Sequence, residues 1–186
     1  MDLITQDLVV YSEHATVTYI RFENADRRGW KETFDHWRKL KTAMRDYNAR
    51  EPNFPEGLSE VAFCLWSGSV RKIKASGSSS FDTFNLATGR AEQIKACSVI
   101  NDLTSFGPKS QWDDLYFLDF WNSGNVDGHF DVYKIPNKLI YEHKVNANET
   151  LRDQQLQGRR PRTNLKSKII VPAGLEPIES SICVWK

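Results

Sequence analysis

The sequence predicts an α/β (α+β) fold in which a central mixed sheet is flanked by helices. Three observations carry this prediction. Within residues 80–98, two runs rich in aromatic and β-branched residues flank a short glycine-containing segment, which is typical of a β-hairpin. Before this hairpin, two stretches place apolar residues at helical spacing. After it, residues 130–140 read as two further strands joined at Pro136-Asn137.

The composition is that of one folded unit, and we expect residues 1–186 to form a single domain. Apolar residues make up 40% of the chain and charged residues 26%, which favours a packed core over disorder. The formal net charge of +1 gives no sign of nucleic-acid binding by itself. Any basic surface must therefore come from an uneven distribution of charge along the chain.

Several classes of protein are disfavoured by absent patterns. The three cysteines form no C-x-x-C pair, so neither a disulfide framework nor a zinc site is expected. No G-x-x-x-x-G-K-[ST] loop occurs, which argues against ATP-driven work. The first residues lack a signal-peptide pattern, and no apolar run approaches the roughly 18 residues of a membrane span. We expect a cytoplasmic protein that does not bind membranes.

The two helices lie on either side of the proline-containing segment 50–57. The first is expected over about 30–48, with an apolar stripe of Trp30, Phe34, Trp37, Met44 and Tyr47. Its solvated face carries Lys31, Arg38, Lys39, Lys41 and Arg45. We interpret it as a packing helix, with a binding helix as the alternative. The second helix buries Leu58, Val61, Ala62 and Leu65.

Four other segments are interpreted more loosely. Residues 5–22 form either a strand or an irregular arm. Residues 67–79 are rich in Gly and Ser and carry Arg71, Lys72 and Lys74, so we expect a solvated basic loop, with a position near phosphate as the alternative. A turn-rich loop follows at 101–108. Between 111 and 131 five aspartates meet no Lys or Arg, which places this segment away from phosphate.

The hairpin carries the candidate chemistry. If Leu86 and Ala91 close the turn, Asp82 faces Lys95, and Phe84 faces Gln93. Because side chains alternate between the faces of a strand, Asp82, Gln93 and Lys95 then share one face. Glu92 points to the other face.

Such a cluster fits metal-dependent phosphodiester hydrolysis. Asp82 and the Gln93 oxygen can bind Mg²⁺, which keeps water in its remaining positions. Lys95 can orient an attacking water or stabilise the anionic transition state. The alternative is an ordinary amphipathic hairpin with a surface Asp–Lys pair.

The pattern D-x10-Q-x-K from Asp82 to Lys95 resembles the PD-(D/E)xK nuclease signature, with glutamine in place of the second acid. Phe81 stands where that signature has proline. The resemblance implies a restriction-endonuclease-like core. It also implies that the preceding helix supplies an additional acid, for which Glu60 is the candidate; the alternative is an acid that only complements the helix dipole.

Other segments resemble a small family of type II restriction endonucleases that cut the interrupted palindrome GCNGC. The resemblance covers roughly residues 52–178, and its most specific part is Q-G-R-R-P-R at 157–162. It implies Mg²⁺-dependent double-strand cleavage that leaves short 5′ overhangs, and a methyltransferase that protects host DNA. A palindromic target also needs two equivalent sites, so we expect a homodimer.

The C-terminal part supplies the basic surface that the net charge conceals. Residues 151–170 carry six Lys or Arg against one Asp, a local charge of +5. Thr150 and Asp153 predict a capping box for a short helix over about 151–157, ended by Gly158, and Pro161 keeps the following chain extended. Arginine can bind guanine bidentately. The candidate DNA-binding residues are Ser105, Gln155, Arg159, Arg160, Arg162 and Asn164, divided between bases and phosphates.

These inferences favour a type II restriction endonuclease with one catalytic and DNA-recognition domain per chain, acting on double-stranded DNA. Two alternatives remain: a repair or junction-resolving nuclease that prefers a DNA structure, and a DNA-binding protein without catalytic activity.

Overall fold

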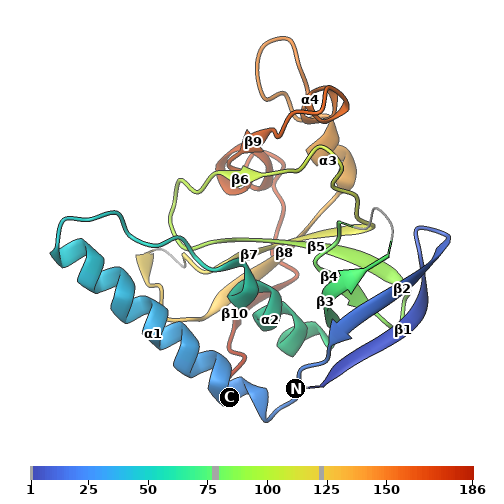
Figure 1. Ribbon diagram of the computed structural model, residues 1–186. Coiled ribbons are helices and arrows are strands. Elements are labelled where there is room, and N and C mark those ends of the chain that lie inside the picture. Colours follow the sequence, from blue (N-terminus) through green and yellow to red (C-terminus); the bar gives the residue numbers. More distant parts are fainter. Residues whose placement is uncertain (1, 77–79, 122–123) are drawn as a thin grey trace.

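The computed structural model describes residues 2–76, 80–121 and 124–186 (Figure 1). The strands of its main sheet are β1 (Leu3–Val10), β2 (Glu13–Ile20), β3 (Val70–Ala75), β4 (Thr83–Asn85), β5 (Arg90–Cys97), β7 (Asp114–Asp119), β8 (Phe130–Ile135) and β10 (Glu179–Ile182). They are hydrogen-bonded in the order β1-β2-β3-β4-β5-β7-β8-β10. Strands β5 and β7 run parallel, whereas the other neighbours are antiparallel. The chain is therefore an α+β protein built on a large mixed sheet, as its sequence predicts.

Two helices cover one face of the sheet, α1 (Asp26–Asp46) and α2 (Glu56–Ser67). Trp30, Phe34 and Trp37 on α1 are buried, and the Trp30 indole donates to the Leu58 carbonyl on α2 at 2.9 Å. This confirms that α1 is a packing helix. The stripe differs from the prediction at Tyr47, which is 81% exposed.

Lys41 was expected in solvent but is buried on the α1 stripe. Its ammonium group lies 5.2 Å from the centre of the Trp37 ring and 3.5 Å from the Glu51 carboxylate. A lysine can occupy such a position because its aliphatic stem packs against apolar neighbours while its charged end reaches a partner.

The N-terminal part of the chain enlarges the sheet. Strands β1 and β2 form a hairpin in which Leu3 pairs with Ile20 and Val10 with Glu13. Strand β3 pairs with β2, so the loop predicted for 67–79 is wrong over 70–75. The free edge of β2 provides a pairing partner that no local signal reveals, and it overrides the Gly/Ser composition. Residues 77–79 lie outside the described residues.

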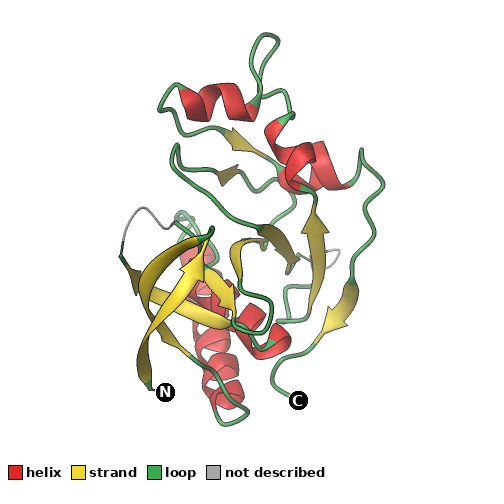
Figure 2. Cartoon of the chain, turned by 90° about the vertical axis from the view of Figure 1, so that its right-hand side faces the viewer, coloured by secondary structure: helices red, strands yellow, loops and turns green. Residues whose placement is uncertain are grey.

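The C-terminal part covers the opposite face of the sheet (Figures 1 and 2). It consists of the ribbon β6 (Thr104–Ser105) and β9 (Arg162–Thr163), the helices α3 (Asn137–Tyr141) and α4 (Leu151–Leu156), and the short π-helix η2 (Lys166–Ile170). The capping box of α4 is present, because Thr150 accepts from the Asp153 N–H and Asp153 accepts from the Thr150 N–H. No helix among the described residues has the length and apolar character needed to cross a membrane.

One strand predicted after β8 is wrong. Residues 137–141 form the helix α3, which begins directly after Pro136 and buries Ile140. Asn137 accepts a hydrogen bond from the Trp112 indole at 2.7 Å and donates to the Asp113 carbonyl at 3.1 Å. The two apolar residues 139 and 140 are too few to distinguish a strand from one helical turn, so packing decides.

Candidate active site

The candidate site lies where β4 and β5 diverge. Thr83 pairs with Glu92 and Asn85 with Arg90. The register of the hairpin is therefore shifted by two residues from the prediction. Leu86 does not pair with Ala91, and Asp82 does not lie opposite Lys95.

The turn explains the shift. The four-residue turn covers residues 86–89 instead of the predicted 87–90, and the Gly89 N–H donates to the Asn85 carbonyl at 2.8 Å. The Asn85 side chain also accepts from the N–H groups of Ala87 and Thr88, each at 3.1 Å. Gly89 adopts φ +67°, which favours glycine.

A shift of two residues keeps every side chain on its expected face, because the period of a strand is two. The Asp82 carboxylate accepts hydrogen bonds from the Gln93 side chain and from the Ile94 N–H, the latter at 2.9 Å. Burial raises the pKa of Asp82, and the positive charge of Lys95 opposes that rise. The structure therefore brings Asp82 and Gln93 into contact, with Lys95 close enough to act on the carboxylate.

The edge of β5 is open at this point. Strand β4 is three residues long, and its ladder with β5 ends at the pair Thr83 and Glu92. Beyond that pair the Asp82 side chain, rather than a strand, binds the Ile94 N–H. On this side, the part of β5 that carries Gln93 and Lys95 therefore has no strand partner among the described residues.

Gln93 has the property expected of a metal ligand. The residue is 4% exposed, and its Oε1 atom has no hydrogen-bond partner among the residues that the structure describes. A buried carbonyl oxygen without a partner is costly unless another group binds it. The described chain contains no group of three His, Cys, Asp or Glu residues placed to hold an ion. Asp82 and Gln93 offer oxygen atoms, which suit a hard divalent cation with water in its other positions.

Helix α2 brings two acids to the same place. Glu60, predicted from the sequence, pairs with Arg71 at 2.5 Å. Its pKa is raised by burial and by the charge of Asp82, against the effect of Arg71. Glu56 lies one turn earlier, is exposed, and raises the pKa of both Asp82 and Glu60. Sequence reasoning missed Glu56, although its i, i+4 spacing from Glu60 places both on one helical face.

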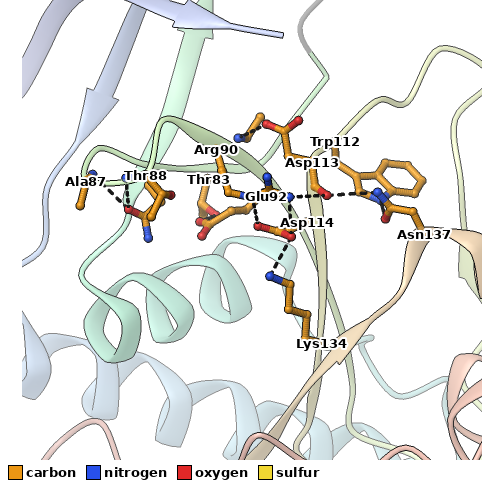
Figure 3. Close-up of polar contacts among 12 residues, drawn as sticks. Thr83, Ala87, Thr88, Arg90, Glu92, Trp112, Asp113, Asp114, Lys134 and Asn137 are labelled. Carbon is orange, nitrogen blue, oxygen red and sulfur yellow. Dashed lines mark hydrogen bonds and ion pairs between the residues drawn. The ribbon is translucent and has the colours of Figure 1, made fainter.

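Glu92 serves a different part of the sheet. It is 2% exposed and accepts a hydrogen bond from the Thr83 hydroxyl at 2.8 Å (Figure 3). Because side chains alternate along the strand, Glu92 lies on the face opposite Gln93. Burial raises the pKa of Glu92. Nearby, Asp114 binds Arg90 at 2.5 Å and Lys134 at 2.8 Å. The cations that neutralise Asp114, in the acidic segment 111–131, thus come from β5 and β8.

A cavity of about 360 Å³ opens beside the candidate site. Its lining includes Glu56 and Ser59 of α2, Lys95 of β5, and Ser105 and Arg162 of the β6–β9 ribbon. Ser105 pairs with Arg162 in that ribbon, and the Lys95 ammonium group lies 6.0 Å from the centre of the Phe106 ring. Two candidate DNA-binding residues thus lie on the same cavity as the candidate catalytic lysine.

The other candidate DNA-binding residues are placed differently. Arg160 is exposed, and Arg159 pairs with Glu149 at 2.5 Å. Gln155 is 3% exposed and donates to the Gly107 carbonyl at 2.8 Å. Asn164 is 9% exposed, donates to the Ile100 carbonyl at 3.3 Å and accepts from the Ser167 N–H at 2.9 Å. The structure gives Gln155 and Asn164 contacts that hold the basic segment against the loop 100–107.

An acid, an amide and a lysine beside a cavity with basic walls are the groups that metal-dependent phosphodiester cleavage uses. The Bsp6I restriction endonuclease family matches residues 22–172. The chain is also 32% identical over 161 residues to the type II restriction enzyme Bsp6I of Bacillus sp. (strain RFL6). These residues make up 85% of this chain and 86% of that protein. No solved structure matches.

The chain belongs to the Bsp6I restriction endonuclease family. It is a homologue of a type II restriction enzyme, a site-specific deoxyribonuclease whose substrate is DNA. Enzymes of this class generally require a divalent metal ion.

Proposed function

We propose that this protein is a Mg²⁺-dependent endonuclease that cuts both strands of DNA at GCNGC. The observation that carries the catalytic part is the contact between Asp82 and Gln93 at the open edge of β5, with the Gln93 Oε1 atom left without a partner and Lys95 beside it. The target sequence, the short 5′ overhangs and the PD-(D/E)xK assignment come from the sequence resemblance alone.

The proposed roles follow from the donor atoms. Asp82 and Gln93 hold the ion through a carboxylate oxygen and the Oε1 atom. When bound, Mg²⁺ supplies positive charge that polarises the scissile phosphate and makes a coordinated water more acidic. Lys95 lines the cavity and holds the attacking water or stabilises the negative charge that develops on the phosphate.

The acids of α2 complete the site. Glu60 remains our candidate for the additional acid, and its ion pair with Arg71 fixes its position. Glu56 lines the cavity, so we add it as a candidate that reaches the ion through water. A carboxylate that acts through water is common at magnesium sites, because the ion keeps several waters when bound.

DNA recognition is assigned to the basic segment. Arg160 and Arg162 are exposed and have no side-chain partner among the described residues, so both are available for bases or phosphates. Arg159, Gln155, Asn164 and Ser105 make contacts that shape this segment, and they remain candidates for DNA contacts as the complex forms.

Recognition of a palindrome on both strands favours a homodimer, in which a two-fold axis relates two equivalent sites. We place its action in the cytoplasm, where bacterial DNA lies, next to a methyltransferase that protects the host sequence.

Plasmid digestion tests the proposal. The wild-type protein with Mg²⁺ should give discrete fragments that end at GCNGC, while Asp82→Ala and Lys95→Ala should fold normally and give none. Fragments from either variant would overturn the site assignment. Cleavage only at junctions or lesions would favour the repair or junction-resolving enzyme, and no cleavage by the wild type would leave a DNA-binding protein.

A further inference from the structure

The segment between α1 and α2 forms one wall of the cavity that contains Lys95, and the fold holds this wall in place. Phe54 packs 4.9 Å from the Trp37 ring and 4.5 Å from the Phe120 ring, measured between ring centres. The Trp37 indole also donates to the Asn53 carbonyl at 3.1 Å. Contacts with the aromatic core therefore fix the position of this wall.

Two adjacent charges on this wall have different surroundings. Glu51 accepts from Arg45 at 2.6 Å and lies 3.5 Å from Lys41, so α1 neutralises it. Arg50 lines the cavity. It is exposed and has no hydrogen-bond or ion-pair partner in the described part of the chain. Glu51 is therefore neutralised, whereas the positive charge of Arg50 faces the cavity without an ion-pair partner among the described residues.

Three cations from distant parts of the chain line this cavity: Arg50 of the α1–α2 segment, Lys95 of β5 and Arg162 of β9. None of the three makes an ion pair within 4.0 Å among the described residues. The acids on the same lining are Glu56 and Asp102. Burial raises the pKa of Asp102. Cations without an ion-pair partner on one cavity repel each other, and a bound anion such as phosphate relieves this repulsion.

We propose that Arg50 and Arg162 form a phosphate-binding site on opposite walls of the cavity, which holds the DNA backbone so that the scissile phosphate meets Lys95. Arg50 is a positioning residue that contacts a phosphate next to the one that is cut. The planar guanidinium group suits this task, because it can donate two parallel hydrogen bonds to phosphate oxygens. The proposal rests on the function proposed above and extends it to a residue that the sequence analysis did not single out.

Equilibrium binding tests the site. The probe is a fluorescent duplex that contains GCNGC, with Ca²⁺ in place of Mg²⁺ to prevent cleavage, and binding is followed by anisotropy at several salt concentrations. Arg50→Ala should weaken binding about tenfold, as expected for a lost charged hydrogen bond. It should also reduce the slope of log K against log salt by about 0.9, the value for one phosphate contact. Arg50→Lys should keep most of the slope.

Arg28→Ala is the matched control, because Arg28 lies at the start of α1, pairs with Glu32 at 2.8 Å and has an 89% exposed side chain. Arg28→Ala removes the same charge without touching the cavity, so the binding affinity and the salt slope should both stay unchanged. If Arg50→Ala behaves like Arg28→Ala, the phosphate site is overturned.

A scan with uncharged methylphosphonate linkages gives a second readout on the unaltered protein. One position beside the cut should weaken wild-type binding but leave binding by Arg50→Ala unaffected. Equal sensitivity of both proteins at every position would contradict the proposal. A wild-type protein that neither binds nor cuts the duplex would instead overturn the proposed function itself.

Discussion

The carboxylate of Asp82 accepts a hydrogen bond from the side chain of Gln93, across the end of the β4–β5 ladder. The contact occupies the Nε2 side of the amide and leaves Oε1 without a partner among the described residues. A carboxylate and a carbonyl oxygen are thus held together before any ion binds. This arrangement determines the first two predictions.

Asp82→Asn keeps the shape of the side chain and removes its charge. We expect single-turnover cleavage to fall by at least about 10³-fold, because a carboxylate ligand anchors an ion that supplies several kcal/mol of transition-state stabilisation. Glu92→Gln is the control, since Glu92 lies on the opposite face of β5 and contacts Thr83. It should cleave at the wild-type rate. Equal losses in the two variants would show that the effect is structural.

Gln93→Glu should retain activity but require a higher pH. Burial already raises the pKa of Asp82, and a second carboxylate beside it raises both values further. Metal binding requires the ionised acids, so the acid limb of the pH–rate profile should move upward. Titration with Mn²⁺, followed by electron paramagnetic resonance, should show the same shift in affinity. A profile that is unchanged, or moved to lower pH, would mean that the side chain at position 93 does not bind the ion.

Arg160→Ala should weaken binding to the specific site by about 1–3 kcal/mol and leave binding to unrelated DNA nearly unchanged, if Arg160 reads a base. Arg159→Ala is the comparison, because Arg159 pairs with Glu149 rather than pointing freely into solvent. Competition titrations with specific and random duplexes measure both quantities. Uniform weakening with a reduced salt slope would instead identify Arg160 as a phosphate contact.

Glu149 should make the basic segment sensitive to acid. Hydrogen bonds from Arg159, and then from Asn146, Gln154 and Gln157, lower its pKa from the ordinary value of 4.5 to about 2. A depressed pKa stabilises the fold above the unfolded value of 4.5, and this stabilisation is lost as the pH falls toward 2.

Urea unfolding measures this effect. Glu149→Gln should be less stable than the wild type at pH 7, and the difference should shrink steadily below pH 4.5. Glu142→Gln is the control, because Glu142 is exposed and lies 4.0 Å from Lys138. A difference that does not depend on pH would contradict the assigned pKa.

The predictions that held rest on local patterns. The helical period identifies the buried face of α1 through Trp30 and Phe34, and the Thr150–Asp153 capping box marks the start of α4. Strand alternation places Gln93 and Glu92 on opposite faces even though the register was wrong by two residues. Each depends on residues a few positions apart, whose relative directions are fixed by backbone geometry.

The predictions that were wrong or incomplete concern features that depend on contacts with residues distant in the sequence. Strand β3 forms because β2 offers an edge, and Glu56 gains its place at the site from the position of α2 against β5. Neither partner is encoded in the neighbouring residues.

The nuclease resemblance, the faces of the hairpin and the charge of the basic segment could be read from the residues alone, because periodicity, motif spacing and composition are local properties. The hairpin register, the ion pair of Glu60 with Arg71, and the common cavity of Arg50, Lys95 and Arg162 became visible in the folded chain alone. Those outcomes depend on how the sheet, α2 and the β6–β9 ribbon pack together, since packing brings into contact residues that the chain separates.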